Sequence, residues 1–333
     1  MRIGVVGAGA VGGAIAALLA RGGHDVEVTA RGEHLEAMRR GGLQLRGAWG
    51  NFTADVTAND VLTRGPELAI VATKAQDAVA AIRQNIALLR GVPVVLIQNG
   101  LEGLMSARAA APRSDFIGGL AMFASSYLSP GAITVTTSGP LYLGGDAAEG
   151  DVPALYAQSV LAQVMGTKVV PNFTGAQWTK LVVNMVNALP AITGLYAQEV
   201  IADRRLRRIF TASLRETVRV GLATGVRFES LQGLTHARLR LLARRPLWAG
   251  QVVPVLMRVR LGPVPNPGST LQSIRRGQPT EIDFLNGAVV RAADAVGADA
   301  PVNALLQALV HEVEETGAFI PVDEVARRSR AAV

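Results

Sequence analysis

The chain contains no cysteine and only four histidines. Disulfides, thiolate nucleophiles and cysteine zinc sites are therefore excluded. The histidines are scattered, and none has the spacing of metal ligands: His24, His34, His236 and His311. We therefore expect no metal site.

Long apolar runs are scarce as well. The stretch from Ile3 to Leu19 is as apolar as the core of a secretory signal. However, five glycines fall between Gly4 and Gly13, which favours a strand and a tight turn over a signal helix. No other run is long and clean enough to cross a membrane. We expect a cytoplasmic protein with no membrane partner.

Acidic residues are fewer than basic ones, and lysine is rare among the basic ones. The formal net charge is +7, and lysine occurs only at Lys74, Lys168 and Lys180. The arginines are spread along helical stretches and do not cluster with aromatic residues, so nucleic-acid binding is not predicted. A surface that uses arginine for solubility, and attracts an anionic cofactor, explains the charge better.

The length of 333 residues favours two domains. In the first part, apolar strands alternate with helical patterns at the spacing of βαβ units, beginning with the strand RIGVVG at 2–7. This alternation predicts a Rossmann-type parallel sheet covered by helices, over residues 1–171. Around 131–144 the pattern changes, and we expect an antiparallel pair at the edge of the sheet.

After Pro171 the pattern becomes helical to the end of the chain. Residues 172–333 are predicted to form an all-helical domain. The apolar residues recur with the helical period of 3.6 over 174–192, 203–224, 231–244, 269–275, 280–297 and 302–317. Three prolines within 262–268 exclude a helix there and predict a loop.

A glycine-rich sequence follows the first strand. It reads Gly7-Ala8-Gly9-Ala10-Val11-Gly12 and has the G-x-G-x-x-G spacing of a dinucleotide-binding turn. Gly7 permits the tight turn, Gly9 lets the backbone approach a pyrophosphate, and Gly12 lets the helix pack against the strand. The phosphates are expected at the amino end of the following helix, where unpaired N–H groups and the helix dipole favour anions.

The end of the second strand indicates which dinucleotide is bound. Sites that prefer NAD usually carry an acidic residue there, whereas an arginine accommodates the 2′-phosphate of NADP. This chain has Thr29-Ala30-Arg31-Gly32 and no acid. Arg31 can pair with a phosphate in a bidentate, charge-assisted way, although it is also compatible with a solvated surface position. The predicted cofactor is NADPH.

The segment after Trp178 supplies a candidate proton donor. Lys180, Asn184 and Asn187 stand at i, i+4 and i+7, so one helical face carries all three among apolar neighbours. Burial lowers the pKa of a lysine, which suits general-acid catalysis. The alternative is that Lys180 extends to solvent at the edge of the helix.

Two further polar groups accompany this helix. One is Ser269-Thr270-Leu271-Gln272 with Thr280-Glu281-Ile282-Asp283, for which helix capping is an alternative role. The other is Gln98-Asn99-Gly100, which ends a strand and therefore lies at the carboxyl edge of the sheet, where ligands of doubly wound folds bind. Lys74 follows another strand and is expected at the same edge.

Together these motifs resemble the ketopantoate reductase (2-dehydropantoate 2-reductase) family, of the wider 6-phosphogluconate dehydrogenase-like group, over nearly the whole chain. The resemblance implies that the helical domain of residues 172–333 is the substrate and catalytic domain. The resemblance rests on the opening GAGAVG, Arg31, Lys74, the QNG at 98–100, the W-x-K-x-x-x-N pattern at 178–184, and the S-x-L-Q…E-I-D-x-L-N-G pattern from Ser269 to Gly287. The last two patterns, in this order, are specific.

The resemblance implies a role for each candidate residue. Lys180 would protonate the new alkoxide while NADPH delivers hydride to the keto carbon, and Glu281 would hold a substrate hydroxyl. Asn99 would bridge nicotinamide and substrate. The remaining residues would bind substrate (Ser269 its carboxylate, Asn184 a distal hydroxyl, Asn187 the substrate more generally) or the cofactor (Lys74 and Arg31).

The chain departs from the family pattern where the far end of the substrate would bind. Ala188 stands where the family usually has asparagine, with Asn187 one position early, and Ala197 and Ser273 also differ. The expected function is NADPH-dependent reduction of 2-dehydropantoate to pantoate in pantothenate biosynthesis. The alternatives are a paralogous reductase of another small 2-keto acid or imine, and a non-enzymatic NADP-binding regulator. A homodimer is compatible with the apolar helical faces, but no interface signal predicts one.

Overall fold

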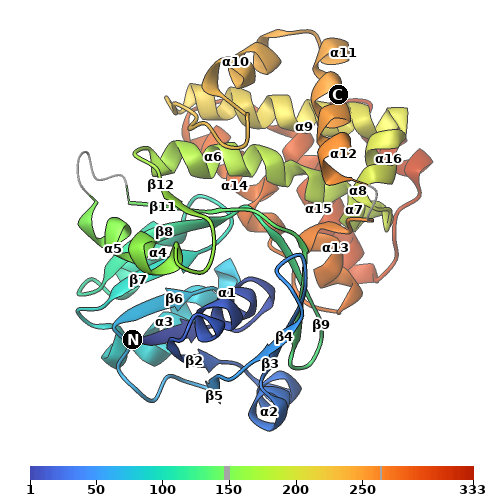
Figure 1. The fold of residues 1–333 in the computed structure, drawn as a ribbon. Coiled ribbons are helices and arrows are strands. Elements are labelled where there is room, and N and C mark those ends of the chain that lie inside the picture. Colours follow the sequence, from blue (N-terminus) through green and yellow to red (C-terminus); the bar gives the residue numbers. More distant parts are fainter. Residues whose placement is uncertain (146–150, 263–264) are drawn as a thin grey trace. The chain divides into compact units, whose positions relative to one another are not determined.

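The computed structural model describes residues 1–145, 151–262 and 265–333, and it divides into two compact units (Figure 1). Unit 1 comprises Met1–Phe173 and unit 2 comprises Thr174–Val333. Unit 1 is built on a mainly parallel sheet and unit 2 is helical. The predicted fold class, a Rossmann-type domain followed by a helical one, is confirmed.

The main sheet of unit 1 has eight strands. They are β1 (Arg2–Val6), β2 (Asp25–Thr29), β5 (Thr57–Asn59), β6 (Leu68–Val71), β7 (Pro93–Ile97), β8 (Asp115–Ala121), β11 (Leu141–Gly144) and β12 (Thr167–Val169). Their order is β12-β11-β8-β7-β6-β1-β2-β5. Every pair from β5 to β8 is parallel, and β11 runs antiparallel to β8. The carboxyl ends of β1, β2, β6 and β7 therefore lie at one edge.

Helices cover this sheet because its strands are apolar on both faces, as in other doubly wound folds. They are α1 (Ala10–Arg21), α2 (Gly32–Gly41), α3 (Ala75–Leu89), α4 (Gly103–Ala110) and α5 (Val152–Leu161). Alternate strand residues such as Ile3, Val5, Val26 and Val28 form one core with buried side chains of α1 and α5. This core holds the amino end of α1 directly after β1.

A second, four-stranded sheet corrects the prediction for 131–144. It comprises β3 (Leu43–Gly47), β4 (Phe52–Ala54), β9 (Ala124–Ser129) and β10 (Ala132–Thr137), in the order β4-β3-β10-β9. The predicted antiparallel pair is wrong, because β10 belongs to this sheet and β11 to the main one. Between them Gly139 approaches Met122 so closely that an added Cβ would lie 2.1 Å from the Met122 carbonyl oxygen. The chain can leave one sheet for the other at this point only with glycine.

Unit 2 consists of helices around one long central helix. The helices are α6 (Phe173–Asn184), α7 (Ala188–Thr193), α8 (Ala197–Ala202), α9 (Arg204–Ala223), α10 (His236–Arg244), α11 (Leu247–Gly250), α12 (Val252–Leu261), α13 (Gly268–Arg275), α14 (Asn286–Ala295), α15 (Pro301–Thr316) and α16 (Val322–Arg328), with 3₁₀ turns η1 (Met185–Asn187) and η2 (Ile282–Phe284). Helix α9 is the central one and packs against α8, α10, α11, α12, α14, α15 and α16. Its buried face includes Leu206, Phe210, Leu214 and Val218.

Two predicted helices are interrupted in the structure. The stretch 174–192 changes from α6 to the η1 turn before α7 begins, and 280–297 begins with the η2 turn before α14. A third, 231–244, starts late, because Thr235 accepts a hydrogen bond from the Arg238 N–H (3.3 Å) and so caps α10. Helices α11 and α12 occupy the segment before the predicted proline-rich loop at 262–268. That loop lies between α12 and α13, and its residues 263–264 are outside the described residues.

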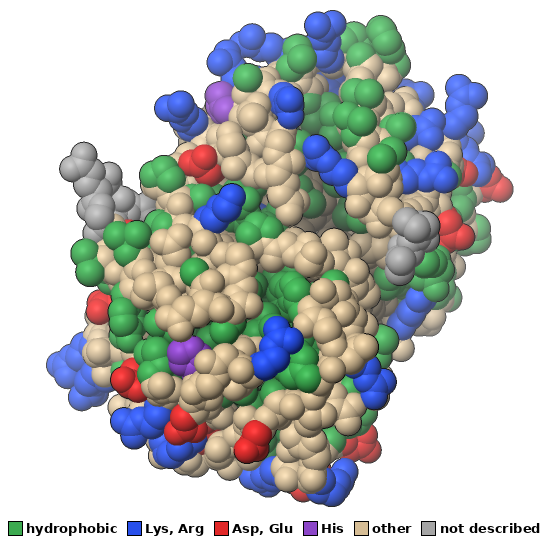
Figure 2. Space-filling view, in the orientation of Figure 1, with side chains coloured by type: hydrophobic (Ala, Val, Ile, Leu, Met, Phe, Trp, Pro, Cys, Tyr) green, Lys and Arg blue, Asp and Glu red, His purple; other side chains and the backbone are tan. Residues whose placement is uncertain are grey.

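The surface agrees with the dispersed arginines of the sequence. In Figure 2 the basic side chains lie at separate places around the visible face and do not form one continuous stripe. Within the part of the chain that the structure describes, no helix combines the length and hydropathy needed to cross a membrane.

Candidate active site

The glycine-rich turn between β1 and α1 has three glycines, and the structure explains two of them from the protein alone. Gly7 has φ +96°, and an added Cβ would lie 2.6 Å from a methyl group of Thr73. At Gly12 an added Cβ would lie 2.1 Å from the Gly7 carbonyl oxygen. Only glycine fits at these positions, because one needs a left-handed backbone and both lack space for a side chain.

Gly9 is different. Its φ is −68°, which any residue can adopt, and an added Cβ would meet nothing within 4 Å. Neither the backbone nor the packing of the protein requires glycine at this position. Gly9 is the N-cap residue of α1, whose first turn presents N–H groups and the positive end of the helix dipole. Open space at such a helix end fits the pyrophosphate of a dinucleotide.

Two buried polar atoms at the same sheet edge also fit a ligand. Thr73 follows β6 and lies against Gly7, and Gln98 follows β7. The Thr73 hydroxyl and the Gln98 side-chain nitrogen are buried and have no hydrogen-bonding partner among the described residues. Buried polar groups normally have partners, so these two atoms favour a polar ligand at this edge. Thr73 was not predicted, because an isolated threonine after a strand carries no sequence signal.

The tip of β2 combines a buried threonine with an exposed arginine. The Thr29 hydroxyl accepts a hydrogen bond from the Gly7 N–H (2.9 Å), and its carbonyl accepts one from the Ala8 N–H (2.8 Å). Thr29 therefore shapes the glycine-rich turn, a role that the sequence did not reveal. Arg31 is exposed just beyond it and donates to the Gln84 side chain on α3 (3.2 Å). The absence of an acid and the exposed Arg31 remain the basis for predicting NADPH.

The other two cofactor candidates lie at the expected edge. Lys74 is the residue before α3, just after β6, and Asn99 follows β7. Strands β6 and β7 are neighbours, with Val71 opposite Leu96. Parallel strands place their carboxyl ends together, so Lys74 and Asn99 follow adjacent strands at the edge where the glycine-rich turn follows β1.

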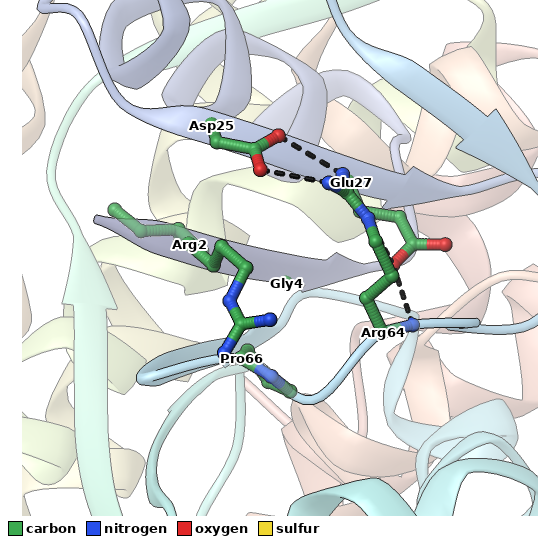
Figure 3. Close-up of a pocket in the computed structure, with 7 residues that line it drawn as sticks. Arg2, Gly4, Asp25, Glu27, Arg64 and Pro66 are labelled. Atoms are coloured by element: carbon green, nitrogen blue, oxygen red, sulfur yellow. Dashed lines mark hydrogen bonds and ion pairs between the residues drawn. The ribbon is translucent and has the colours of Figure 1, made fainter.

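A small pocket lies at the opposite edge of the sheet (Figure 3). Its lining includes Arg2 and Asp25, the first residues of β1 and β2, and Arg64 pairs with Asp25 through two hydrogen bonds of 2.7 and 2.9 Å. Its volume of about 10 Å³ suffices for roughly one water molecule. This pocket is too small for a substrate and contains none of the predicted site residues.

Within unit 2, Lys180 is buried on α6, with 8% of its surface exposed. The alternative in which it extends to solvent is therefore wrong. Burial lowers the pKa of its ammonium group to about 8, because water no longer stabilises the charge, and the nearby carboxylate of Glu281 opposes this shift. Lys180 and Glu281 thus interact electrostatically, although they are far apart in the sequence.

The remaining substrate candidates divide into buried and exposed residues. Asn184 ends α6 and is partly buried, whereas Asn187 lies in η1 and is buried. The side-chain oxygen of Asn187 lies against Gly268, where an added Cβ would be only 2.4 Å away. Gly268 has φ +70° and begins α13, so the exposed Ser269 follows directly. The structure therefore brings Asn187 next to the Ser269 segment.

Glu281 lies before a 3₁₀ turn and not inside an α-helix. Thr280 accepts a hydrogen bond from the Ile282 N–H (3.2 Å), but the N-cap residue of this turn is Glu281, whose side chain makes no capping hydrogen bond. Asp283 accepts hydrogen bonds from Gln307 (2.6 Å) and pairs with His311 (2.8 Å). Asp283 therefore anchors the segment to α15, while Glu281 is the carboxylate close to Lys180.

The comparisons with known proteins agree with this geometry. The model described as "Ketopantoate reductase PanE/ApbA" matches residues 3–147, and "Ketopantoate reductase PanE/ApbA C terminal" matches residues 172–314. The chain belongs to the ketopantoate reductase family. This is a family of oxidoreductases, so the resemblance inferred from the motifs is confirmed.

Relatives of this ketopantoate reductase family member span nearly its whole length. A 2-dehydropantoate 2-reductase of Pyrococcus horikoshii is 28% identical over 323 residues, which cover 95% of this chain and 99% of the relative. The crystal structure of a PanE/ApbA family ketopantoate reductase from Ralstonia eutropha has a TM-score of 0.79 at 27% identity, over 95% of this chain and 99% of that one. D-mandelate dehydrogenase with NADH and anilino(oxo)acetate has a TM-score of 0.81 at 20% identity, with the same two coverages, and shares the fold.

Metal ligands are not gathered anywhere in the described parts of this ketopantoate reductase family member. Over residues 1–145, 151–262 and 265–333, no group of three histidine or acidic side chains could hold an ion.

Proposed function

We propose that the protein reduces the keto group of 2-dehydropantoate to give pantoate, with NADPH as the reductant. The observation that supports this most directly is the buried Lys180, whose pKa is lowered to about 8 beside Glu281. A lysine in this state can donate a proton at neutral pH. The reduction of a keto group to a hydroxyl, the reaction proposed here, needs such a proton.

The ammonium of Lys180 is suited to general-acid catalysis. With a pKa of about 8, it is mostly protonated at pH 7 and yet gives up its proton more readily than an ordinary lysine. The bound dinucleotide would supply hydride to the keto carbon. Lys180 would donate a hydrogen bond to the keto oxygen and then transfer its proton to the alkoxide, which stabilises the developing negative charge.

The surrounding residues would bind and orient the substrate. Glu281 would accept a hydrogen bond from a substrate hydroxyl while keeping the Lys180 ammonium charged. Ser269, exposed at the start of α13, would bind the carboxylate, and Asn184 and Asn187 would bind the distal hydroxyl end. Asn99, at the end of β7, would contact both nicotinamide and substrate.

The preference for NADPH rests on the β2 tip and the first turn of α1. Arg31 would pair with the 2′-phosphate, and Lys74 would add a second positive charge at the same sheet edge. The hydroxyl of Thr29, which replaces the usual acid there, is already bonded to the Gly7 N–H. No acidic residue lies in the first turn of α1, so the pyrophosphate meets no like charge there. We assign this activity to the cytoplasm, in pantothenate biosynthesis.

The same geometry supports a paralogous reductase as the second candidate. Ala188 and Ala197 are buried, and the Ser273 hydroxyl donates to the Ser269 carbonyl of its own helix (3.2 Å). Ala188 and Ala197 therefore offer no polar side chain toward a substrate hydroxyl, and the O–H donor of Ser273 is already used within its own helix. A 2-keto acid with a less polar tail would suit them, and an imine would need the same acid at Lys180.

Initial rates of NADPH oxidation would test the proposal. Purified protein would be assayed with 2-dehydropantoate, with 2-ketoisovalerate, which lacks the hydroxyl, and with a cyclic imine. We expect the highest kcat/KM for 2-dehydropantoate. A higher value for 2-ketoisovalerate or the imine would favour the paralogue, and tight NADPH binding without turnover of any of them would favour the regulator. Repetition with NADH would test the cofactor preference separately.

A further inference from the structure

His34 is buried beneath the glycine-rich turn, although it belongs to the next helix. It lies on α2, is 8% exposed, and its ring packs against Tyr127 on β9 with ring centroids 4.5 Å apart. No role was predicted for it, since a lone histidine on a helix carries no signal for chemistry. Its two ring nitrogens contact two segments that are distant from each other in sequence.

The contacts of His34 define its protonation state. The Gly131 N–H donates to Nδ1 (2.9 Å), so Nδ1 must carry a lone pair. The hydrogen then resides on Nε2, which donates to the Ala8 carbonyl oxygen (2.7 Å). Burial lowers the pKa of His34, in spite of the opposing effect of the Ala8 carbonyl, and this favours the neutral ring. The imidazole is therefore a rigid link between a donor on the β9–β10 turn and an acceptor in the glycine-rich turn.

This link determines how one peptide group of the turn is oriented. In a trans peptide the C=O and the N–H point in opposite directions. When His34 holds the Ala8 carbonyl, the Gly9 N–H is directed to the other side of the peptide. The Gly7 and Ala8 N–H groups are held by Thr29. Thr29 thus holds two N–H groups of the turn, and His34 holds one of its carbonyl groups, just before the amino end of α1.

We propose that His34 is a positioning residue for dinucleotide binding, which orients the Ala8–Gly9 peptide of the glycine-rich turn through its Nε2–H. The inference rests on the proposed dinucleotide site and adds to it a residue that does not touch the ligand. Without this hydrogen bond the Ala8–Gly9 peptide can rotate, and the affinity for the pyrophosphate falls. The catalytic groups of unit 2 are unaffected, so kcat at saturating dinucleotide is unchanged.

Two conservative variants separate the two hydrogen bonds. The side-chain amide nitrogen of glutamine can occupy the place of Nε2, so His34→Gln keeps the bond to Ala8 and loses that to Gly131. The amide oxygen of asparagine can occupy the place of Nδ1, so His34→Asn keeps the bond to Gly131 and loses that to Ala8. Each variant loses one hydrogen bond and the ring contact with Tyr127, so their melting temperatures provide a matched control for stability.

The dissociation constant of NADPH would be measured by titration calorimetry for the wild type and both variants. Loss of one hydrogen bond that orients the turn corresponds to a roughly tenfold change in the equilibrium constant. We expect His34→Asn to bind NADPH about tenfold more weakly than the wild type, with a higher KM for NADPH and the same kcat, and His34→Gln to bind within about twofold.

Other outcomes overturn the proposal. Equal NADPH affinity in all three proteins, or weak binding by His34→Gln alone, would show that the Ala8 contact does not govern affinity. If neither variant folds, ¹⁵N NMR of the wild-type histidines decides instead. An Nε2–H tautomer of His34 whose N–H signal changes on NADPH addition supports the link, and an Nδ1–H tautomer or an unchanged signal refutes it. A wild type that binds neither NADPH nor NADH refutes the proposed function itself, which distinguishes the two failures.

Discussion

Replacement of Lys180 by methionine should inactivate the protein and at the same time stabilise it. The two side chains have similar length and volume, so the change removes mainly the charge. In the folded protein burial lowers the pKa of Lys180 from 10.5 to about 8, which corresponds to about 3 kcal/mol of unfavourable burial of the charged form. In the unfolded chain the pKa is ordinary. At pH 7 the folded state therefore bears a penalty that a buried methionine would not have.

The pH dependence of stability has a sign that follows from this shift. Between pH 8 and 10.5 the unfolded chain binds the proton of this lysine and the folded chain does not, so the stability of the wild type should rise with pH through that window. Lys180→Met should abolish this rise and increase the free energy of unfolding at pH 7 by up to about 3 kcal/mol. Its kcat should fall by roughly 10²-fold or more, the usual loss on removing a general acid.

Denaturant unfolding and NADPH oxidation with 2-dehydropantoate would measure the two effects on the same samples. Lys168→Met is the matched control, because Lys168 is exposed on β12 and a surface substitution should change stability by less than about 0.5 kcal/mol. Unchanged turnover in Lys180→Met would refute the catalytic assignment. A loss of about 3 kcal/mol would refute the burial argument, since it would mean that the ammonium is a net stabilising group in the fold.

Three further predictions concern the same proton and the cofactor. The kcat/KM of the wild type should be constant well below pH 8 and fall above it, because kcat/KM reports the acid of the free enzyme and this acid must be protonated. The fall should be absent from the residual activity of Lys180→Met, and a kcat/KM that rises above pH 8 would contradict the acid role. Gly9→Ala should change the free energy of unfolding by less than about 1 kcal/mol but weaken NADPH binding at least about tenfold, because only a ligand needs the open space beside Gly9. Gly12→Ala should instead lower the free energy of unfolding by roughly 1–3 kcal/mol, because its Cβ would meet the Gly7 carbonyl. Thermal melts and NADPH titrations of both variants would measure these effects. If Gly9→Ala lowered stability as much as Gly12→Ala, the space at Gly9 would not be reserved for a ligand. Arg31→Gln should weaken NADPH binding about 10- to 100-fold and leave NADH binding unchanged, as loss of a charged hydrogen bond implies, and equal loss for both dinucleotides would remove the 2′-phosphate assignment.

Local patterns in the sequence sufficed for the parts of the fold that depend on neighbouring residues. The strand, glycine-rich turn and helix from Arg2 to Arg21 are encoded by a short apolar run, by glycines at fixed spacing and by alanines of high helix propensity. The helical period of the second half likewise predicts most of its helices. Strands β3, β4 and β5 were not predicted, because β4 and β5 are only three residues long and because β3 and β5 pair with strands that are not adjacent to them in the sequence.

The predicted site residues were found from motif order, but their environment required the fold. The spacing of Lys180, Asn184 and Asn187 predicts a shared helical face, yet the chain changes to a 3₁₀ turn after Asn184, so the spacing alone did not determine where Asn187 lies. Whether Lys180 is buried or solvated could not be read from its neighbours in sequence. Burial depends on what packs over the helix from elsewhere in the chain.

The sequence by itself therefore determined the family and the fold class and nominated the candidate residues, since these follow from patterns only a few residues long. Only the tertiary structure decided the electrostatics of Lys180 beside Glu281 and the contact of His34 with both Ala8 and Gly131, which lies 97 residues away in the chain. The physical reason is that desolvation and hydrogen bonding act between groups that are close in space, and local sequence does not specify which distant segments become neighbours.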